Sequence, residues 1–401
     1  MSGPLGFTYQ DPDTATDVKK SLPWVESLLV FGVSYIDSTS RPARTGPVVA
    51  RFAPRDLYQP VRAVASAVSV RLEKEGARTE TLIDDNRLVD RAAAVRAGVG
   101  WLGRSTMVLA PGSGPWMLLG TVATDATLRP TSPMKRDCGT CMACIPACPT
   151  GAIDDGVLDA RRCLSTWLQT PGSIPHWIRP RLGRRIYGCD DCLTSCPPGQ
   201  PALRASVAEP SDWSFEELLA LDDQSLLDRF SWWFVPRRDG RYIRRNLLVA
   251  AGNSRERGVH GHLIEHLSHK SSMIRGHAAW AVARSGHPDA STTLREALRD
   301  ESTPEGRDEL ALALIMLSQP EFFDRVLEED ERVATDPDLV ALGLVGETEN
   351  PDRTGSDLRL ITLSRNSLPA ADESELEGVI RVNDRDRIME RMRRQARAGG
   401  P

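Results

Sequence analysis

Apolar and polar positions alternate in blocks along the first third of the chain. Four apolar segments bounded by Pro, Gly or Asp predict β-strands, at residues 25–36, 78–84, 106–111 and 116–124. Residues 60–76 and 87–98 carry apolar side chains at spacings of three and four, which predicts helices ending at Gly76 and Gly98. This order predicts an α/β domain over residues 1–130. It places Asp84 at the end of a strand, where ligands of such sheets commonly bind.

A second pattern occupies the region from about residue 240 to 320. Segments that begin at Arg244, Arg275 and Arg307 each carry an apolar helical stripe, and they lie 31 and 32 residues apart. Gly or Pro turns separate these segments. The repeat predicts a short α-helical solenoid related to HEAT repeats. We therefore expect a HEAT-like helical repeat region over residues 206–330 and a C-terminal extension over residues 331–401.

The composition indicates a globular protein with more than one domain. The chain has 401 residues, of which 40% are hydrophobic, and a formal net charge of −5. Its longest apolar stretch is far shorter than the roughly 20 residues that span a bilayer. Residues 1–13 have neither the basic start nor the apolar run of a signal peptide. These features predict a cytoplasmic protein without a membrane partner, and we expect a monomer.

The cysteines are confined to one region of the chain. All eight lie between Cys138 and Cys196, which is typical of a metal site and not of a secreted disulfide framework. The first run has the bacterial ferredoxin spacing C-x2-C-x2-C-x3-C-P, in which three thiolates hold one [4Fe-4S] cluster and the fourth reaches a second cluster. It comprises Cys138, Cys141, Cys144 and Cys148. The second set comprises Cys163, Cys189, Cys192 and Cys196.

The spacing predicts that the two runs exchange their last ligands, within a ferredoxin-like two-cluster domain over residues 131–205. One cluster would be held by Cys138, Cys141, Cys144 and Cys196. The other would be held by Cys148, Cys163, Cys189 and Cys192. Two structural zinc sites are the alternative, but zinc usually takes its ligands as two separated C-x2-4-C pairs without a Cys-Pro ending.

Arginine is unevenly placed in this acidic chain. The run from residue 237 to 245 holds five arginines: Arg237, Arg238, Arg241, Arg244 and Arg245. The run is compatible with a solvated face that carries surface ion pairs. It is equally compatible with a surface that contacts the phosphates of a polyanion. His260, His262 and His266 have no matching cysteines or carboxylates at ligand spacing, and we expect them at the surface.

These motifs, in this order, resemble epoxyqueuosine reductases that carry a C-terminal HEAT-like repeat. The resemblance extends from about residue 45 to 320 and rests on the segments GVGWLGRSTMVL, PWMLLGTVATD, DCGTCMACIPACPTGAI, RRCLSTWLQT, IYGCDDCLTSCP, IRRN and IRGHAAWAVARSGHPDA. It implies a cobalamin-dependent enzyme that removes the epoxide oxygen of epoxyqueuosine at the tRNA wobble position and so forms queuosine. The clusters would pass electrons to the cobalamin from an external donor: an unknown reductase, a flavodoxin or a ferredoxin.

The resemblance also implies roles for single residues in a corrinoid-binding and catalytic domain over residues 1–130. Asp84 would be the catalytic residue, which protonates the oxygen as it leaves. A capping role at the following helix is the alternative for Asp84. The tRNA would contact the arginines of the run 237–245. The corrinoid would be bound by Arg51, Asp84, Thr106, Met107 and Ser165.

Two other functions stay open on the residues alone. The chain could be a non-catalytic electron-transfer protein of the two-cluster ferredoxin type, with the helical repeat as a docking arm for another protein. It could also be a corrinoid reductase that acts on a small molecule. Cobalamin binding would exclude the ferredoxin function, and queuosine content of tRNA would separate the remaining two.

Overall fold

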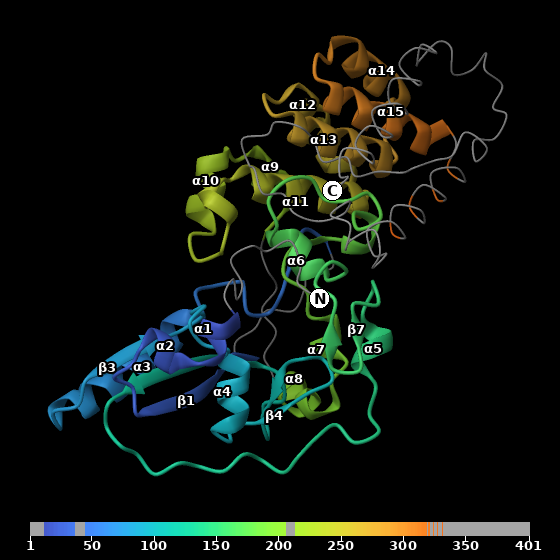
Figure 1. Cartoon of the computed structure of the whole chain (residues 1–401). Coiled ribbons are helices and arrows are strands. Elements are labelled where there is room, and N and C mark those ends of the chain that lie inside the picture. Colours follow the sequence, from blue (N-terminus) through green and yellow to red (C-terminus); the bar gives the residue numbers. More distant parts are fainter. Residues whose placement is uncertain are drawn as a thin grey trace, which may run out of the picture. The chain divides into compact units, whose positions relative to one another are not determined.

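The structure is a computed structural model that describes residues 12–36, 45–205 and 213–318, together with residues 320, 324, 327 and 331. Its internal contacts divide the chain into two units (Figure 1). Unit 1 comprises Met1–Pro42, Val49–Cys163 and Cys189–Ser211, and unit 2 comprises Ala43–Val48, Leu164–Gly188 and Asp212–Pro401. The domain boundaries at residues 130, 205 and 330 stay predictions. Apart from Glu331, the predicted extension over 331–401 lies outside the described residues.

Unit 1 holds the mixed α/β elements. Its helices are α1 (Pro12–Thr16), α2 (Val18–Ser21), α3 (Tyr58–Lys74), α4 (Asp90–Arg96), α5 (Cys144–Ala147), α7 (Asp191–Thr194) and α8 (Gln200–Ala205), with the 3-10 turn η3 (Pro197–Gly199). Its strands are β1 (Ser27–Ser34), β3 (Thr79–Leu82), β4 (Trp101–Leu102), β5 (Val108–Leu109), β6 (Met117–Thr124), β7 (Ile153–Asp154) and β8 (Val157–Leu158). The predicted α/β fold is confirmed, although β5 is much shorter than the segment 106–111 that predicted it.

A three-stranded antiparallel sheet forms the core of unit 1 (Figure 1). β6 is the central strand and pairs with β1 and with β3. Successive side chains of a strand point to opposite faces of the sheet. A Cβ atom on Gly120 would lie only 2.8 Å from Val61 of α3, whereas Ala123 belongs to the same apolar cluster as Ala93 of α4. The two helices therefore cover opposite faces, which explains why most of β6 is buried.

Unit 2 is helical. Its elements are α6 (Leu164–Gln169), η2 (Pro180–Leu182), β9 (Arg185–Tyr187), α9 (Phe215–Ala220), α10 (Asp223–Arg229), η4 (Pro236–Arg238), α11 (Arg241–Ser254), η5 (Arg257–Val259), α12 (His260–Glu265), η6 (His266–Ser268), α13 (Ser272–Ser285), α14 (Ala290–Asp300) and α15 (Pro304–Ser318). The short strand β2 (Val48–Val49) pairs with β9, and the Val48 amide donates to the carbonyl of Arg184, the residue before β9, at 2.8 Å. Within the part of the chain that the structure describes, no helix is long and apolar enough to cross a membrane.

The three helices that the sequence repeat predicts pack side by side in unit 2 (Figure 1). α13 contacts α11 on one side and α15 on the other. The α11–α13 contact is so close that a Cβ atom on Gly252 would lie 2.7 Å from the Cα atom of Ala281. Glycine at this position lets the two helices approach. The helical-repeat prediction for this region is confirmed.

Candidate iron–sulfur centre and acid site

The two cysteine runs of unit 1 have similar backbones. Each contains one short helix just before its last cysteine, α5 in the first run and α7 in the second. These two helices pack together. Cys148 has φ −73° and ψ 117°, and Cys196 has φ −73° and ψ 116°. Both residues precede a proline, which disfavours the helical conformation for the residue before it. The Cys-Pro ending therefore gives the last thiol of each run the same extended backbone.

The thiols of the first run gather around a cysteine of the second. Burial raises the pKa of Cys196 to about 11, and the thiolates that add to this rise are those of Cys138, Cys144 and Cys141. Burial likewise raises the pKa of Cys144, with further contributions from Cys138 and Cys141. Four thiols thus share one neighbourhood, and they are the four that the ferredoxin spacing assigns to one cluster.

The other four thiols form a second neighbourhood. Burial raises the pKa of Cys192, and the thiolates of Cys189, Cys163 and Cys148 add to the rise. Among the described residues, no group of three or more His, Cys, Asp or Glu side chains is arranged to hold a single metal ion. A [4Fe-4S] cluster takes four cysteine thiolates, one on each iron atom. The two groups of four thiols therefore match the ligand number of two clusters.

Backbone amides and one cation lie close to these thiols. The amide of Ala152 lies 3.2 Å from Cys148 Sγ, and the amide of Arg104 lies 3.4 Å from Cys138 Sγ. The Arg104 guanidinium donates to the carbonyl of Gly139 at 2.9 Å and forms an ion pair with Asp155. Hydrogen bonds to sulfur and nearby charge both change the reduction potential of a cluster. Arg104 supplies both beside the first group of thiols.

The loop that carries Arg104 also reaches α4. It joins β4 to β5 and is closed by Gly103, whose amide donates to the Met107 carbonyl at 2.8 Å. Thr106 in this loop has φ +65°, a conformation that residues other than glycine seldom adopt. Arg91 of α4 donates to the Thr106 carbonyl at 2.9 Å. One loop therefore connects the first group of thiols to the helix that follows Asp84.

Asp84 lies in the turn between β3 and α4, shortly after β3 ends at Leu82. It has φ +51°, and its carboxylate accepts no hydrogen bond from the described residues. Partial desolvation by the surrounding protein raises its pKa, Asp90 and Asp85 add to the rise, and Arg91 opposes it. The side chain nonetheless stays open to solvent. A substrate can therefore reach a carboxyl group that keeps its proton to higher pH than an ordinary aspartate.

The turn before α4 is held by Asp85 and not by Asp84. Asp85 accepts a hydrogen bond from the Arg87 amide at 2.9 Å and pairs with its guanidinium at 2.7 Å. The hydrogen bonds from Arg87 lower the pKa of Asp85. α4 begins at Asp90, and the preceding residue, Val89, provides no side-chain cap. The capping alternative for Asp84 is therefore wrong.

Arg51 lies beside the second group of thiols. Its amide donates to Asp190 at 2.6 Å, and Asp190 stands between Cys189 and Cys192 in the sequence. The guanidinium lies 5.6 Å from the ring centre of Trp116. Its Nε atom is buried and has no hydrogen-bond partner among the described residues. Buried donors are normally paired, so this atom fits a contact with a polar group of a ligand.

The other residues predicted to bind a corrinoid are divided between the units. Met107 packs against the apolar cluster that contains Trp116, so it shares a neighbourhood with Arg51. Thr106 is connected to the Asp84 turn through Arg91. Ser165 belongs to α6 of unit 2, where its Oγ atom accepts a hydrogen bond from Gln169 at 3.2 Å. The structure thus connects four of the five residues within unit 1.

The cysteine-rich region, the helical repeat and a larger part of the chain all match known proteins. Residues 137–199 match the 4Fe-4S double cluster binding domain, and residues 237–315 match HEAT repeats. The epoxyqueuosine reductase of Alicycliphilus denitrificans is 35% identical over 255 residues, which cover 57% of this chain and 69% of that protein. This chain belongs to the epoxyqueuosine reductase family.

Solved structures of epoxyqueuosine reductases match most of the fold. One contains a tRNA-Tyr epoxyqueuosine-modified tRNA stem loop; it has a TM-score of 0.70 and 29% identity, and the match covers 78% of this chain and 88% of that chain. Another, from Bacillus subtilis, has an aspartate catalytic loop swung out of the active site; its TM-score is 0.70 at 29% identity, with 79% of this chain and 88% of that chain covered. The double-cluster module and the helical repeat predicted from the sequence are confirmed by these matches.

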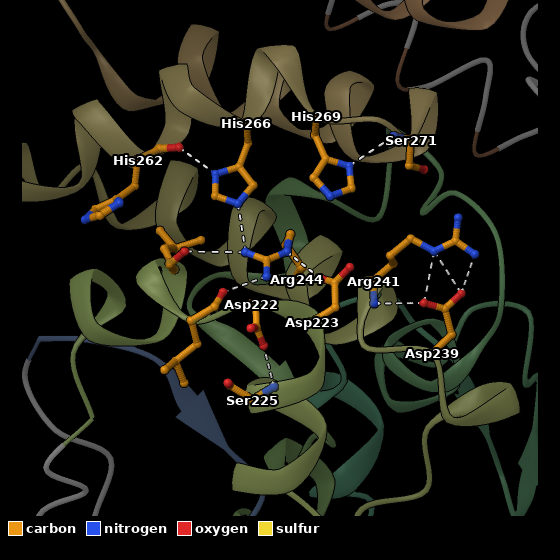
Figure 2. A network of polar contacts seen from close by, with 12 residues as sticks. Asp222, Asp223, Ser225, Asp239, Arg241, Arg244, His262, His266, His269 and Ser271 are labelled. Atoms are coloured by element: carbon orange, nitrogen blue, oxygen red, sulfur yellow. Dashed lines mark hydrogen bonds and ion pairs between the residues drawn. The ribbon is translucent and has the colours of Figure 1, made fainter.

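In this member of the reductase family, folding separates the arginines of the run 237–245. Arg244 and Arg245 are only 4% and 1% exposed. Figure 2 shows Arg244 at the centre of a polar network, where it donates to Asp223 at 2.6 Å and contacts His266 at 2.8 Å. Because these two guanidinium groups are buried and used inside unit 2, they are not available to a phosphate. The expectation that they contact tRNA is corrected accordingly.

The other three arginines of the run lie nearer the surface. Arg241 pairs with Asp239 at 2.6 Å (Figure 2). Arg238 is exposed and donates to the Trp233 carbonyl at 3.2 Å. Arg237 is exposed, has φ +53° and makes no hydrogen bond to the described residues. Arg237 is therefore the arginine of this run best placed to meet a phosphate.

The roles of three residues in these networks were not predicted from the sequence. Arg91 has no motif around it, and only the turn geometry brings it to Thr106 and Asp84. Arg104 stands inside the GWLGRS segment, so that segment was the available signal. His266 was expected at the surface, but it is 7% exposed, and burial lowers its pKa. Its position is corrected because Arg244 holds its ring inside unit 2.

Proposed function

We propose that this chain reduces epoxyqueuosine to queuosine in tRNA, with two [4Fe-4S] clusters and a corrinoid as cofactors and Asp84 as the proton donor. The observation that carries the proposal is the likeness to a reductase structure that contains an epoxyqueuosine-modified tRNA stem loop. Two further features support it. Unit 1 holds two groups of four thiols, and it holds an open aspartic acid with a raised pKa.

The reaction defines what the protein must supply. Removal of the epoxide oxygen as water leaves a carbon–carbon double bond, and it consumes two electrons and two protons. The clusters and the corrinoid, when bound, supply the electrons and the low-valent metal that reduces the epoxide carbon. The protein supplies the thiolate ligands, orients the substrate and delivers a proton to the departing oxygen.

Asp84 is suited to deliver that proton. Breaking the carbon–oxygen bond leaves an alkoxide, a strong base that must be protonated where it forms. Partial desolvation and the charge of Asp90 raise the pKa of Asp84, which favours its protonated form. After the transfer, the charge of Arg91 favours the carboxylate that is left. Asp84 also lies in a loop between two elements, as expected for the counterpart of the mobile aspartate loop in the Bacillus subtilis enzyme.

The cofactor residues follow from the same arrangement. One cluster is assigned to Cys138, Cys141, Cys144 and Cys196 and the other to Cys148, Cys163, Cys189 and Cys192. The corrinoid is assigned to Arg51, Asp84, Thr106, Met107 and Ser165, supported chiefly by the unpartnered Nε atom of Arg51. An external reductase, flavodoxin or ferredoxin provides the electrons. A tRNA substrate implies a cytoplasmic location, and a monomer suffices for the chemistry.

Asp84→Asn tests the role of the acid. The substitution keeps the shape of the side chain and removes its transferable proton. We expect both clusters and cobalamin to stay bound while turnover of epoxyqueuosine-containing tRNA falls by about 10² to 10⁴, the usual contribution of general-acid catalysis. Queuosine formation is measured by mass spectrometry of digested tRNA under anaerobic conditions.

Asp125→Asn is the matched control. Asp125 directly follows the end of β6, it is also exposed, and its Oδ1 atom accepts a hydrogen bond from the Arg78 amide at 2.8 Å. Asparagine keeps that acceptor, so this variant should turn over as the wild type does. If Asp125→Asn loses activity and Asp84→Asn does not, Asp84 is not the acid. If the purified protein binds no cobalamin, the electron-transfer function becomes the better proposal.

A further inference from the structure

The segment between Cys163 and Cys189 belongs to a different unit from those two cysteines. Cys163 and Cys189 belong to unit 1, whereas the residues that join them, Leu164–Gly188, belong to unit 2. Helix α6 begins directly after Cys163, and β9 ends at Tyr187, just before Gly188 and Cys189. Unit 2 therefore fixes a stretch of chain whose two ends continue directly into two of the eight cysteines.

Two adjacent side chains of α11 bind the backbone near both ends of this segment. Asn246 Nδ2 donates to the Leu168 carbonyl at 2.8 Å, near the end of α6, and to the Ile186 carbonyl at 3.0 Å, within β9. One amide group thus joins the chain that leaves Cys163 to the chain that approaches Cys189. Asn246 is 2% exposed, so no water competes for these two carbonyls.

Arg245 reinforces the same connection. Its guanidinium donates to the carbonyls of Thr170 at 2.8 Å and Trp167 at 3.1 Å, and also to Gly172. It further donates to Asn246 Oδ1 at 2.9 Å, which orients the Asn246 amide. The planar guanidinium can satisfy several carbonyls at once in one fixed geometry. Together the two side chains clamp the C-terminal end of α6.

Arg245 is an unusual residue to find in a helical core. It is 1% exposed, and its hydrogen-bond acceptors among the described residues are carbonyl and amide oxygens, with no carboxylate among them. Burial lowers its pKa to about 9, so it stays a cation at neutral pH. A buried cation is costly, and an apolar side chain of similar size would pack at lower cost. Its presence is explained if the geometry of α6 matters beyond the stability of the helices.

We propose that Arg245 and Asn246 are positioning residues for the second cluster: by fixing both ends of the segment Leu164–Gly188, they set the places of Cys163 and Cys189. The inference rests on the proposed assignment of these cysteines, with Cys148 and Cys192, to one cluster. The helical repeat then supports cluster assembly in addition to any contact with tRNA. The middle of the segment is anchored separately, by Arg179, which pairs with Glu309 of α15 at 2.8 Å.

Asn246→Asp tests this role with little change in shape. The aspartate keeps the Oδ1 acceptor for Arg245 and loses the donor to the Leu168 and Ile186 carbonyls. The matched control is Asn253→Asp on the same helix. Asn253 Nδ2 donates to the carbonyls of Arg179 at 2.7 Å and Gly183 at 3.0 Å, the residues on either side of η2, and so bonds neither α6 nor β9.

The full-length variants are reconstituted anaerobically with iron and sulfide, and iron content and electron paramagnetic resonance of the reduced protein are measured. We expect Asn246→Asp to fall from about eight to about four iron atoms per chain. It should lose the same resonance that Cys192→Ser loses, while Asn253→Asp keeps both. Equal iron content in Asn246→Asp and Asn253→Asp, with both resonances unchanged, would overturn the inference.

One further variant, Arg245→Lys, covers the case in which Asn246→Asp does not fold. If circular dichroism shows that Asn246→Asp is unfolded, Arg245→Lys replaces it, since lysine keeps the charge and loses the planar fork. Arg245→Lys should then shift or broaden the second resonance selectively, and an unchanged spectrum overturns the inference. If Cys192→Ser itself keeps the full iron content, the cluster assignment fails, which is distinct from failure of the positioning role.

Discussion

Asp84 and Asp85 are neighbours in the sequence, yet the protein moves their pKa values in opposite directions. Asp85 is paired with Arg87, whose hydrogen bonds lower its pKa, whereas partial desolvation and Asp90 raise the pKa of Asp84. The positive φ of Asp84 belongs to the same turn that gives Asp85 its partner. One carboxylate thus stabilises the turn, and the other accepts no hydrogen bond from the described residues, which suits the proton donor we propose. Strained backbone at a reactive side chain is common in active sites.

The pH dependence of turnover should follow the charges around Asp84. A proton donor is active only while protonated, so the rate falls as the pH rises through the pKa of Asp84. Asp90→Asn removes a negative charge that raises this pKa. We therefore expect the fall in kcat to occur at lower pH in Asp90→Asn than in the wild type. Single-turnover rates between pH 5 and 9 measure the shift.

Arg91→Gln should shift the pH profile of turnover in the opposite direction. The charge of Arg91 lowers the pKa of Asp84, so its removal should move the fall in rate to higher pH. Two variants that move the profile in the same direction, or not at all, would contradict Asp84 as the titrating acid. The midpoints of the pH profiles are compared, and not the rates themselves. Arg91→Gln also removes the hydrogen bond to the Thr106 carbonyl, which can lower the rate at every pH.

At the scale of elements, the sequence predicted most where the binding of a cofactor constrains the spacing of its ligands. The cysteine spacing predicted two sets of four thiols, because the cysteines that bind a [4Fe-4S] cluster occur at characteristic spacings in the sequence. The strands β1 and β6 were predicted because their apolar runs are long and bounded. The loop 103–107 was not predicted, since its structure depends on contacts from Arg104 to Cys138 and from Arg91 to Thr106. Such contacts join distant segments and leave no periodic signal.

The exchange of last ligands between the runs is testable with Cys196→Ser. Cys196 stands in the second run of the sequence, but its thiol shares the neighbourhood of Cys138, Cys141 and Cys144. We therefore expect Cys196→Ser to lose the same cluster signal as Cys141→Ser and about half of the iron. Iron analysis and electron paramagnetic resonance after anaerobic reconstitution provide the measurement. Loss of the signal that Cys192→Ser loses would instead assign each cluster to a single run.

At the scale of the whole molecule, the sequence was least informative about the arginines between residues 237 and 245, where helix α11 begins. The arginines from 237 to 245 look like one basic surface in the sequence. η4 leaves Arg237 and Arg238 exposed, whereas α11 turns Arg244 and Arg245 into the core of unit 2. The sequence predicted the helical repeat, but it could not show which side of α11 would be covered. That depends on α6 and α13, which come from other parts of the chain.

Binding of tRNA should therefore depend on Arg237 and not on the buried members of the run. Arg237 is exposed and without a hydrogen bond to the described residues, so Arg237→Glu changes charge without disturbing the core. If Arg237 contacts a phosphate, the variant should bind tRNA more weakly, and the slope of log Kd against log salt concentration should fall by about one. Filter binding or fluorescence anisotropy at several salt concentrations gives both quantities.

Arg71→Glu is the matched control for this last experiment. Arg71 lies on α3 of unit 1, its side chain is 78% exposed, and its exposed ion pair with Glu75 contributes little to stability. Both variants change the net charge of the protein by the same amount. If they weaken tRNA binding equally, the effect is one of overall charge and Arg237 makes no specific contact. If only Arg237→Glu reduces the salt slope, the surface next to η4 in unit 2 takes part in holding the tRNA.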